Sequence, residues 1–224
     1  MPVLKTLLLT ICLLSAVLSN QVLHAQTNAI TVRFGGNAGI SLSDGKQTIC
    51  FDFPYSSGAF GYMRFDSAAL KAVQRDAILI FTHRHPDHYW RHHTKFYTGK
   101  KYARRNRKKL PKRLPNQVSE VSIQVFRTKH RFCFKHYSYL LEWHGKRFFI
   151  SGDTEHPETI GKIKNIDYAF VPPWILSYAK AKNISIDAKT KVIYHLYPNE
   201  KVEQAMDIND KVLDKLGMEF QVPI

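Results

Sequence analysis

One short segment concentrates the side chains of this sequence that are best suited to bind a metal ion. His83, His85, Asp87 and His88 fall within six residues, in THRHPDHYW. Pro86 disfavours a regular helix, so a tight loop can turn several of these side chains toward one point. Imidazole nitrogens and a carboxylate at this density are ligands for a borderline transition metal, zinc above all. The segment therefore predicts a metal site.

Two strand-like runs are expected to position this loop. Residues 77–81, AILIF, form a short and wholly apolar run, which is typical of a strand covered on both faces. Functional loops often follow such strands. Asp52 ends another strand-like run, QTICFDF. Its carboxylate could orient a metal-bound histidine by accepting a hydrogen bond from the second ring nitrogen, or it could be a turn residue; both interpretations remain open.

The remaining sequence alternates between two groups of strands and a few helices. Strands are expected early in AITVRFGG, GISLSD and QTICFDF, and later in SIQVFRT, YSYLLEW, KRFFISGD, YAFVPP and KVIYHLYP. Helices are expected at 66–75, 157–164 and 200–216. Strands in two groups, with helices between and after them, predict an α+β layered sandwich.

The segment HRHPDH has the H-x-H-x-D-H form of the metallo-β-lactamase-fold superfamily, and its flanks extend the resemblance. VRFGGNAGISLSDGKQTICFDF looks like the opening strands of the ascorbate-6-phosphate lactonase-like branch, a group of metal-dependent hydrolases. GKRFFISGDTEH resembles the strand whose final aspartate bridges two metals, and KVIYHLYPNE resembles the strand that delivers the last histidine. The resemblance covers most of residues 29–200. It implies a four-layer αβ/βα sandwich, with two β-sheets flanked by helices.

The resemblance also implies a ligand set for two zinc ions, with other divalent transition metals left open. The first ion would take His83, His85 and a mid-chain histidine, the second would take Asp87, His88 and His195, and Asp153 would bridge them. Comparison with the similar branch selects His130 as the mid-chain ligand. We expect His136 to be a pocket or surface residue.

The predicted function is that of an exported, binuclear zinc-dependent hydrolase that cleaves an ester, lactone, amide or phosphoester bond. The metals would activate water, and Asp87 would orient it and pass a proton to the leaving group. Relatives often have small residues where this chain has PPWIL, so Trp174 is expected to reshape the pocket. Two alternatives remain open: a phosphodiesterase or nuclease of the same fold, and a non-catalytic protein that binds polyanions.

Positive charge is concentrated in one segment of the chain, which has a formal net charge of +15. From His88 to Ser119 there is no Asp or Glu, and nine basic residues lie between Lys100 and Arg113. Such a block predicts a solvated loop or helix that attracts anions. The expected partner is a small, anionic substrate or, through residues 95–113, an anionic envelope surface. The block has no base-reading motif, which argues against nucleic acid.

The first 25 residues differ from the rest of the chain. Lys5 is their only charged residue, and residues 7–18 form an apolar run that is too short to span a bilayer. This pattern predicts a secretory signal at 1–25, with a hydrolase domain at 26–224 and a periplasmic or secreted location. Export would permit a disulfide between Cys50 and Cys133, although the sequence does not say whether they meet.

Overall fold

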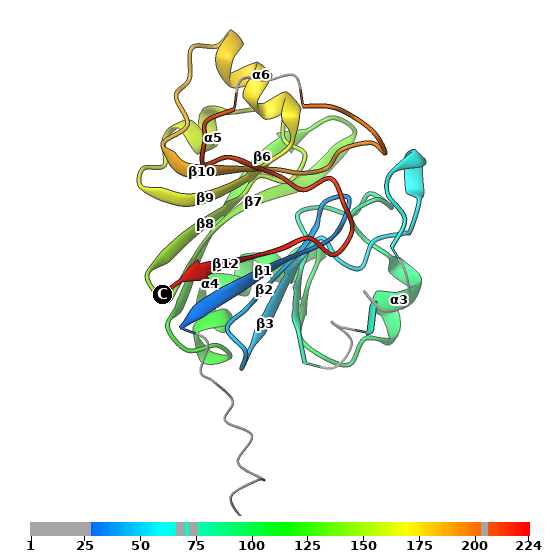
Figure 1. The fold of residues 1–224 in the computed structure, drawn as a ribbon. Helices are drawn as coiled ribbons and strands as arrows, with labels where there is room; N and C mark the ends of the chain where they lie inside the picture. The colour runs from blue at the N-terminus through cyan, green and yellow to red at the C-terminus, as the bar shows by residue number, and fades with distance from the viewer. Residues whose placement is uncertain (1–27, 66–69, 72–75, 203–205) are drawn as a thin grey trace, which may run out of the picture.

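Strand pairing organises the chain into two mixed sheets (Figure 1). The structure, a computed structural model, describes residues 28–224 except 66–69, 72–75 and 203–205. The expected signal at 1–25 lies outside these residues, as does most of the helix expected at 66–75, of which residues 70–71 are helical.

The first sheet has the strand order β12-β1-β2-β3-β4-β5. Its strands are β1 (Ala29–Gly36), β2 (Gly39–Ser43), β3 (Thr48–Phe51), β4 (Ile78–Ile80), β5 (Lys101–Tyr102) and β12 (Glu219–Pro223). Strands β12, β1, β2 and β3 pair antiparallel, whereas β3, β4 and β5 pair parallel. The parallel pairing places the carboxyl ends of β3 and β4 at one edge of the sheet.

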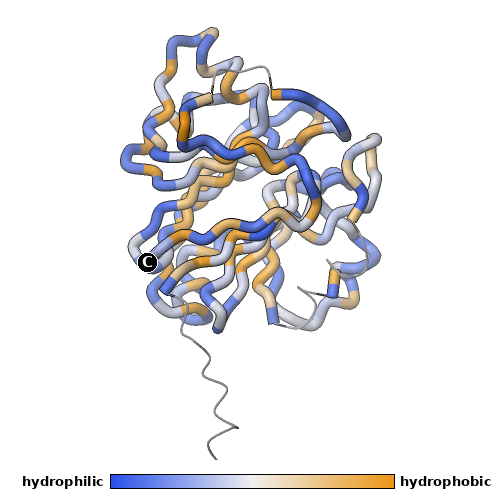
Figure 2. Tube along the Cα trace, viewed as in Figure 1, coloured by the Kyte–Doolittle hydropathy of each residue, from blue (hydrophilic) through white to orange (hydrophobic). Residues whose placement is uncertain are grey.

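The second sheet has the order β11-β10-β9-β8-β7-β6. Like the first sheet, it has an antiparallel half and a parallel half. Its strands are β6 (Val121–His130), β7 (Cys133–Trp143), β8 (Lys146–Ile150), β9 (Ile166–Val171), β10 (Ala188–Ile193) and β11 (Lys211–Val212). Strands β6, β7 and β8 form an antiparallel meander, and β8 to β11 pair parallel. Figure 2 shows hydrophobic residues concentrated along the strands of both sheets.

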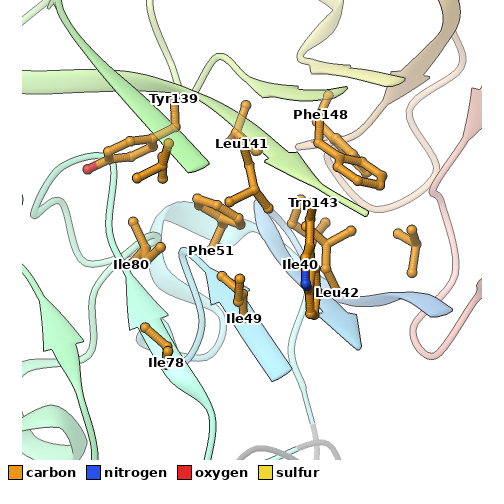
Figure 3. Close-up of a cluster of buried hydrophobic side chains, with 14 of the residues drawn as sticks. Ile40, Leu42, Ile49, Phe51, Ile78, Ile80, Tyr139, Leu141, Trp143 and Phe148 are labelled. Carbon is orange, nitrogen blue, oxygen red and sulfur yellow. The ribbon is translucent and has the colours of Figure 1, made fainter. Parts of the chain in front are cut away.

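The main hydrophobic core lies between the two sheets (Figure 3). The first sheet contributes aliphatic side chains such as Ile40 and Ile80, and the second contributes aromatic ones such as Trp143 and Phe148. All four side chains are fully buried. Burial of this apolar area is the main force that holds the sheets face to face.

The outer face of each sheet is also covered. Helices α5 (Glu158–Gly161) and α6 (Pro173–Ala181) pack over the second sheet, where Ile160 and Ile175 join a separate apolar cluster (Figure 1). On the first sheet, Leu79 and Phe81 join a cluster with residues from the loops and from the end of helix α3 (Arg91–Phe96). The predicted sandwich of two sheets flanked by helices is confirmed.

Two helix predictions need correction. The helix expected at 200–216 is wrong: the described residues there form turns and strand β11. Helix α6 was not expected, because the sequence pattern indicates a strand at residues 168–173, YAFVPP, and no helix directly after it. Pro173 is the first residue of α6, a position where its fixed φ and missing N–H suit a helix.

The basic block is anchored to the core rather than fully solvated. It forms η2 (Arg104–Lys109), α4 (Leu110–Arg113) and η3 (Leu114–Asn116). Leu110 and Leu114 are fully buried in the main core, whereas Lys108, Lys109, Lys112 and Arg113 are exposed. Alternation of apolar and basic residues therefore gives this segment a buried side and a charged side.

Two further findings concern the two cysteines and the lengths of the helices. Cys50 and Cys133 are free thiols, and burial raises the pKa of Cys50 to about 12. The disulfide that export would permit is therefore not formed. Among the described residues, no helix is long and apolar enough to cross a membrane.

Candidate metal centre

The predicted metal ligands come together because each lies at the carboxyl end of a strand. His83, His85, Asp87 and His88 follow β4, His130 ends β6, Asp153 follows β8, and His195 follows β10. Asp52 directly follows β3. Apolar strands thus bring chain segments far apart in sequence to one edge of the sandwich.

Three histidines form the first ligand group. One ring nitrogen from each of His83, His85 and His130 lies within 4.8 Å of the others. Nε2 of His130 is 3.3 Å from Nδ1 of His85. His136 is not in this group. The structure therefore brings together the three histidines that the resemblance assigned to the first ion.

Two carboxylates and two histidines form the second group: Asp87, His88, Asp153 and His195, all of which are buried. Nε2 of His88 lies 2.9 Å from Nε2 of His195. Oδ2 of Asp87 lies 3.5 Å from Nε2 of His88 and 3.4 Å from Nε2 of His195. Two imidazole nitrogens aimed at one point between carboxylate oxygens form a typical transition-metal ligand set.

Asp153 lies between the two groups. Its Oδ2 is 2.9 Å from Nε2 of His88 in the second group. The same oxygen is 3.9 Å from Nε2 of His83 and 4.0 Å from Nε2 of His130 in the first. A carboxylate in this position can serve both groups, as the bridging role requires.

Buried polar atoms test whether these residues fit bound metal ions. Nε2 of His83 and Oδ1 of Asp87 are buried and have no hydrogen-bond partner among the described residues. An unsatisfied buried polar atom costs about 1–3 kcal/mol, so such atoms generally have another partner. Both atoms belong to residues of the ligand groups: a metal ion would satisfy the His83 nitrogen, and a water molecule held at the metal would satisfy the Asp87 oxygen. The site therefore fits a pair of transition-metal ions.

Asp52 orients His88 and the loop that carries it. Oδ2 of Asp52 lies 2.9 Å from Nδ1 of His88, and the carboxylate also accepts hydrogen bonds from the Thr82 amide at 2.7 Å and the Thr82 hydroxyl at 2.6 Å. Burial opposes a charge on His88, but the carboxylates of Asp153 and Asp52 hold its pKa well above the ordinary value. The geometry matches the histidine-orienting interpretation of Asp52.

His136 holds the backbone of Asp153 in place. Its Nε2 accepts a hydrogen bond of 2.9 Å from the Asp153 amide, and its Nδ1 lies 2.7 Å from the Thr128 hydroxyl. Burial lowers the pKa of His136 to about 3, so the ring is neutral and can accept from that amide. At Gly152 a Cβ would lie 2.7 Å from Nε2 of His136, so this contact requires glycine.

The same network sets the charge of the second group. Burial alone would raise the pKa of Asp153, but the neighbouring imidazoles of His195 and His88 hold it well below its ordinary value. Burial alone would lower the pKa of His195, but the Asp153 carboxylate outweighs this effect and raises the pKa to about 9. Asp153 is therefore ionised and ready to coordinate a cation.

Aromatic rings form a wall beside His195. Trp174 lies edge-on to the His195 ring, with centroids 5.2 Å apart, so it borders the site as expected. Tyr62 lies edge-on at 4.4 Å and stacks on Tyr197 at 4.2 Å. Tyr62 was missed, because nothing in its loop sequence marks it as a neighbour of a histidine that follows β10.

Two other contacts of the ligands were also missed. The Asn37 side-chain amide donates a hydrogen bond of 2.7 Å to the Asp87 carbonyl, and the backbone carbonyl of Asn37 accepts one from the amide of His195. Oε1 of Glu155 lies 3.2 Å from Nδ1 of His130. Asn37 stands in the GGNAG turn, and its polar side chain in a glycine-rich turn was the available signal.

Solved structures with this architecture identify the fold. Igni18, a metallo hydrolase from the archaeon Ignicoccus hospitalis, superposes with a TM-score of 0.64 at 16% identity, over 88% of this chain and 99% of its own. The metallo-β-lactamase fold protein YhfI from Bacillus subtilis gives a TM-score of 0.60 at 12% identity, over 87% and 99%. The diiron β-hydroxylase CmlA from Streptomyces venezuelae gives 0.52 at 12% identity, over 87% and 54%.

These similarities show that the chain has the metallo-β-lactamase fold. No sequence-family model matches the chain, and no curated protein sequence matches it. The assignment to the ascorbate-6-phosphate lactonase-like branch therefore stays a prediction. The neighbours include both hydrolases and an oxygenating diiron enzyme, so the fold and ligand set define a metal-binding protein without fixing the metal or the reaction.

Proposed function

We propose that this protein is a hydrolase that depends on two transition-metal ions, zinc first among them, and that cleaves an ester, lactone, amide or phosphoester bond. The observation that carries the proposal is the convergence of seven ligand side chains from four segments, with Asp153 between the two groups. When bound, such ions would lower the pKa of a water molecule and polarise the bond to be cleaved. In hydrolysis, one water is consumed: its oxygen joins the acyl or phosphoryl centre, and a proton goes to the leaving group.

The protein's own residues would prepare the site for that reaction. His83, His85 and His130 would hold one ion, and Asp87, His88 and His195 the other. Oδ1 of Asp87, which lacks a hydrogen-bond partner among the described residues, would orient water and move a proton toward the leaving group.

Asp52 and His136 would keep the ligands in place, and the Trp174 ring would limit access beside His195. Rigid ligands matter because a misplaced nucleophile or metal loses most of the rate advantage. We further propose, from the sequence pattern of residues 1–25, that the chain is exported.

Metal content and activity test the proposal together. Protein expressed with zinc should carry about two ions per chain by elemental analysis. A panel of p-nitrophenyl esters, bis-p-nitrophenyl phosphate, lactones and a chromogenic β-lactam should reveal an activity that a chelator abolishes and zinc restores. His83→Ala should lose metal and activity, whereas His92→Ala, which changes an exposed histidine outside both groups, should keep them.

Three results would contradict the proposal. They are absence of metal after zinc-supplemented expression, hydrolysis that survives complete chelation, and activity that returns only with iron and requires oxygen. The last result would instead favour chemistry of the kind named for CmlA.

A further inference from the structure

A cavity of about 710 Å³ opens beside the first ligand group. His85 is shared by the cavity and that group. Arg84, Arg107 and Lys135 line it, together with residues 132–134 at the tip of the β6–β7 hairpin. A pocket of this volume is suited to a small organic ligand.

The charge of the lining selects for an anion. Three of the lining residues are cationic at neutral pH, and none is an Asp or Glu. Arg107 is 1% exposed and is held in place because its guanidinium donates hydrogen bonds to the carbonyls of Phe81 and Thr82. The Arg84 guanidinium lies over the Tyr89 ring, 4.9 Å from its centroid. Positive charge in a concave site attracts and orients negative ligands.

The hairpin tip adds an apolar surface to this charge. Phe132 and Phe134 line the cavity, yet their exposed fractions are 85% and 93%. The guanidinium of Arg131 lies 5.0 Å from the Phe132 ring centroid. Aromatic rings provide large contact areas for the apolar part of a ligand. Two exposed rings at the mouth of a cationic cavity therefore favour a ligand that is both apolar and anionic.

We propose that this cavity receives the acyl portion of the substrate, and that this portion carries a negative charge on an aromatic body. Lys135 and Arg84 attract the negative group, and Phe132 and Phe134 cover the ring. The bond to be cleaved then lies on the side of His85. This inference rests on the proposed hydrolase function and adds the substrate class.

Two matched esters test the inference on the zinc-loaded protein. 4-Nitrophenyl 4-carboxybenzoate is anionic, and 4-nitrophenyl 4-methylbenzoate is neutral but similar in shape. Wild type should show the higher kcat/KM for the anionic ester. Lys135→Gln should lower kcat/KM for that ester about tenfold, as expected for one charge-assisted contact, and leave the neutral ester almost unchanged. Phe134→Ser should lower kcat/KM for both.

Lys108→Gln is the matched control. Lys108 is exposed and follows Arg107 in the chain, but it does not line the cavity. At about 0.15 M salt this change should have little effect, because screening weakens charges beyond about 8 Å. Equal losses in Lys108→Gln and Lys135→Gln would overturn the proposal, because they would show that the overall positive charge of the protein, rather than the cavity, attracts the anionic ester. Equal rates for the two esters in wild type would also overturn it.

A binding measurement separates failure of the cavity from failure of the hydrolase proposal. If neither ester is cleaved, the hydrolase proposal loses support, and calorimetry with 4-ethylbenzenesulfonate still tests the cavity, because a sulfonate coordinates metals weakly. Wild type should bind it more tightly than Lys135→Gln by about tenfold. Identical affinities, or no binding to wild type, would overturn the cavity proposal.

Discussion

At the residue scale, His130 and His136 lie on the same hairpin but have different roles. A ring nitrogen of His130 belongs to the first ligand group, whereas His136 accepts a hydrogen bond from the amide of Asp153. Removing a ligand removes a metal-bonding atom. Removing a residue that only orients a ligand typically weakens metal affinity by about 10–100-fold.

This difference gives the first prediction. His130→Ala should lower the metal content to about one ion per chain and abolish hydrolysis, because three histidines define the first group. His136→Ala should keep most of its metal when zinc is in excess. Elemental analysis after gel filtration measures both. Metal loss in His136→Ala with full retention in His130→Ala would show that these roles are reversed.

At the element scale, the segment η2–α4–η3 combines a dense positive charge with a firm attachment to the core. Leu110 and Leu114 are fully buried, and Arg107 reaches the carbonyls of Phe81 and Thr82 just before the metal loop. Apolar contacts thus hold a self-repelling segment in place. The segment positions the Arg107 cation in the cavity, whereas Lys108, Lys109, Lys112 and Arg113 are exposed to solvent.

The second prediction follows from this attachment. Leu110→Ala should lower the free energy of unfolding by about 2–5 kcal/mol, because it leaves a cavity in the core between the sheets. Lys112→Ala, an exposed change on the same short helix, should stay within about 0.5 kcal/mol of wild type. Urea unfolding followed by circular dichroism measures both. Equal, small effects would mean that the segment is not anchored as described.

At the scale of the whole molecule, an ion-pair cluster joins turns of the two sheets. His144, between β7 and β8, lies 3.1 Å from Oδ2 of Asp44, between β2 and β3, and 2.8 Å from Oε2 of Glu120. Partial burial opposes the charge, but hydrogen bonds to these carboxylates raise the pKa of His144 above its ordinary value. The protonated ring therefore favours the folded state.

The third prediction concerns pH. Because the folded-state pKa of His144 is raised, its stabilisation is fully present below the unfolded pKa of about 6.5 and is lost as pH rises through the folded pKa. His144→Asn should lower the free energy of unfolding by about 1 kcal/mol or less at pH 6 and by less at pH 9. Asparagine tolerates the positive φ of 49° at this turn.

Urea unfolding of wild type and variant at low salt, at both pH values, gives the comparison. Any backbone cost of the substitution is the same at both, so only the pH-dependent difference reports the ion pairs. A gap between the two proteins that does not change with pH would contradict the assigned role.

The sequence alone was sufficient to predict the ligand loop, because its ligands are close together in the chain and follow an apolar strand. It also predicted two groups of strands, since their alternation and turn residues are local signals. The resemblance added the distant residues Asp153 and His195. Helix α6 and the extended residues near 211 were missed because packing on the sheet, rather than local pattern, decides their structure.

Only the tertiary structure decided which distant groups meet. It brought Tyr62 beside His195, placed His136 where it accepts a hydrogen bond from the Asp153 amide, and formed the cavity between Arg107 and the β6–β7 hairpin. None of these contacts has a periodic or compositional signature, since each joins segments from different strands or loops. The sequence therefore determined which ligand atoms are available, and the packing of two sheets determined their separations, their supporting contacts and the charge of the adjoining cavity.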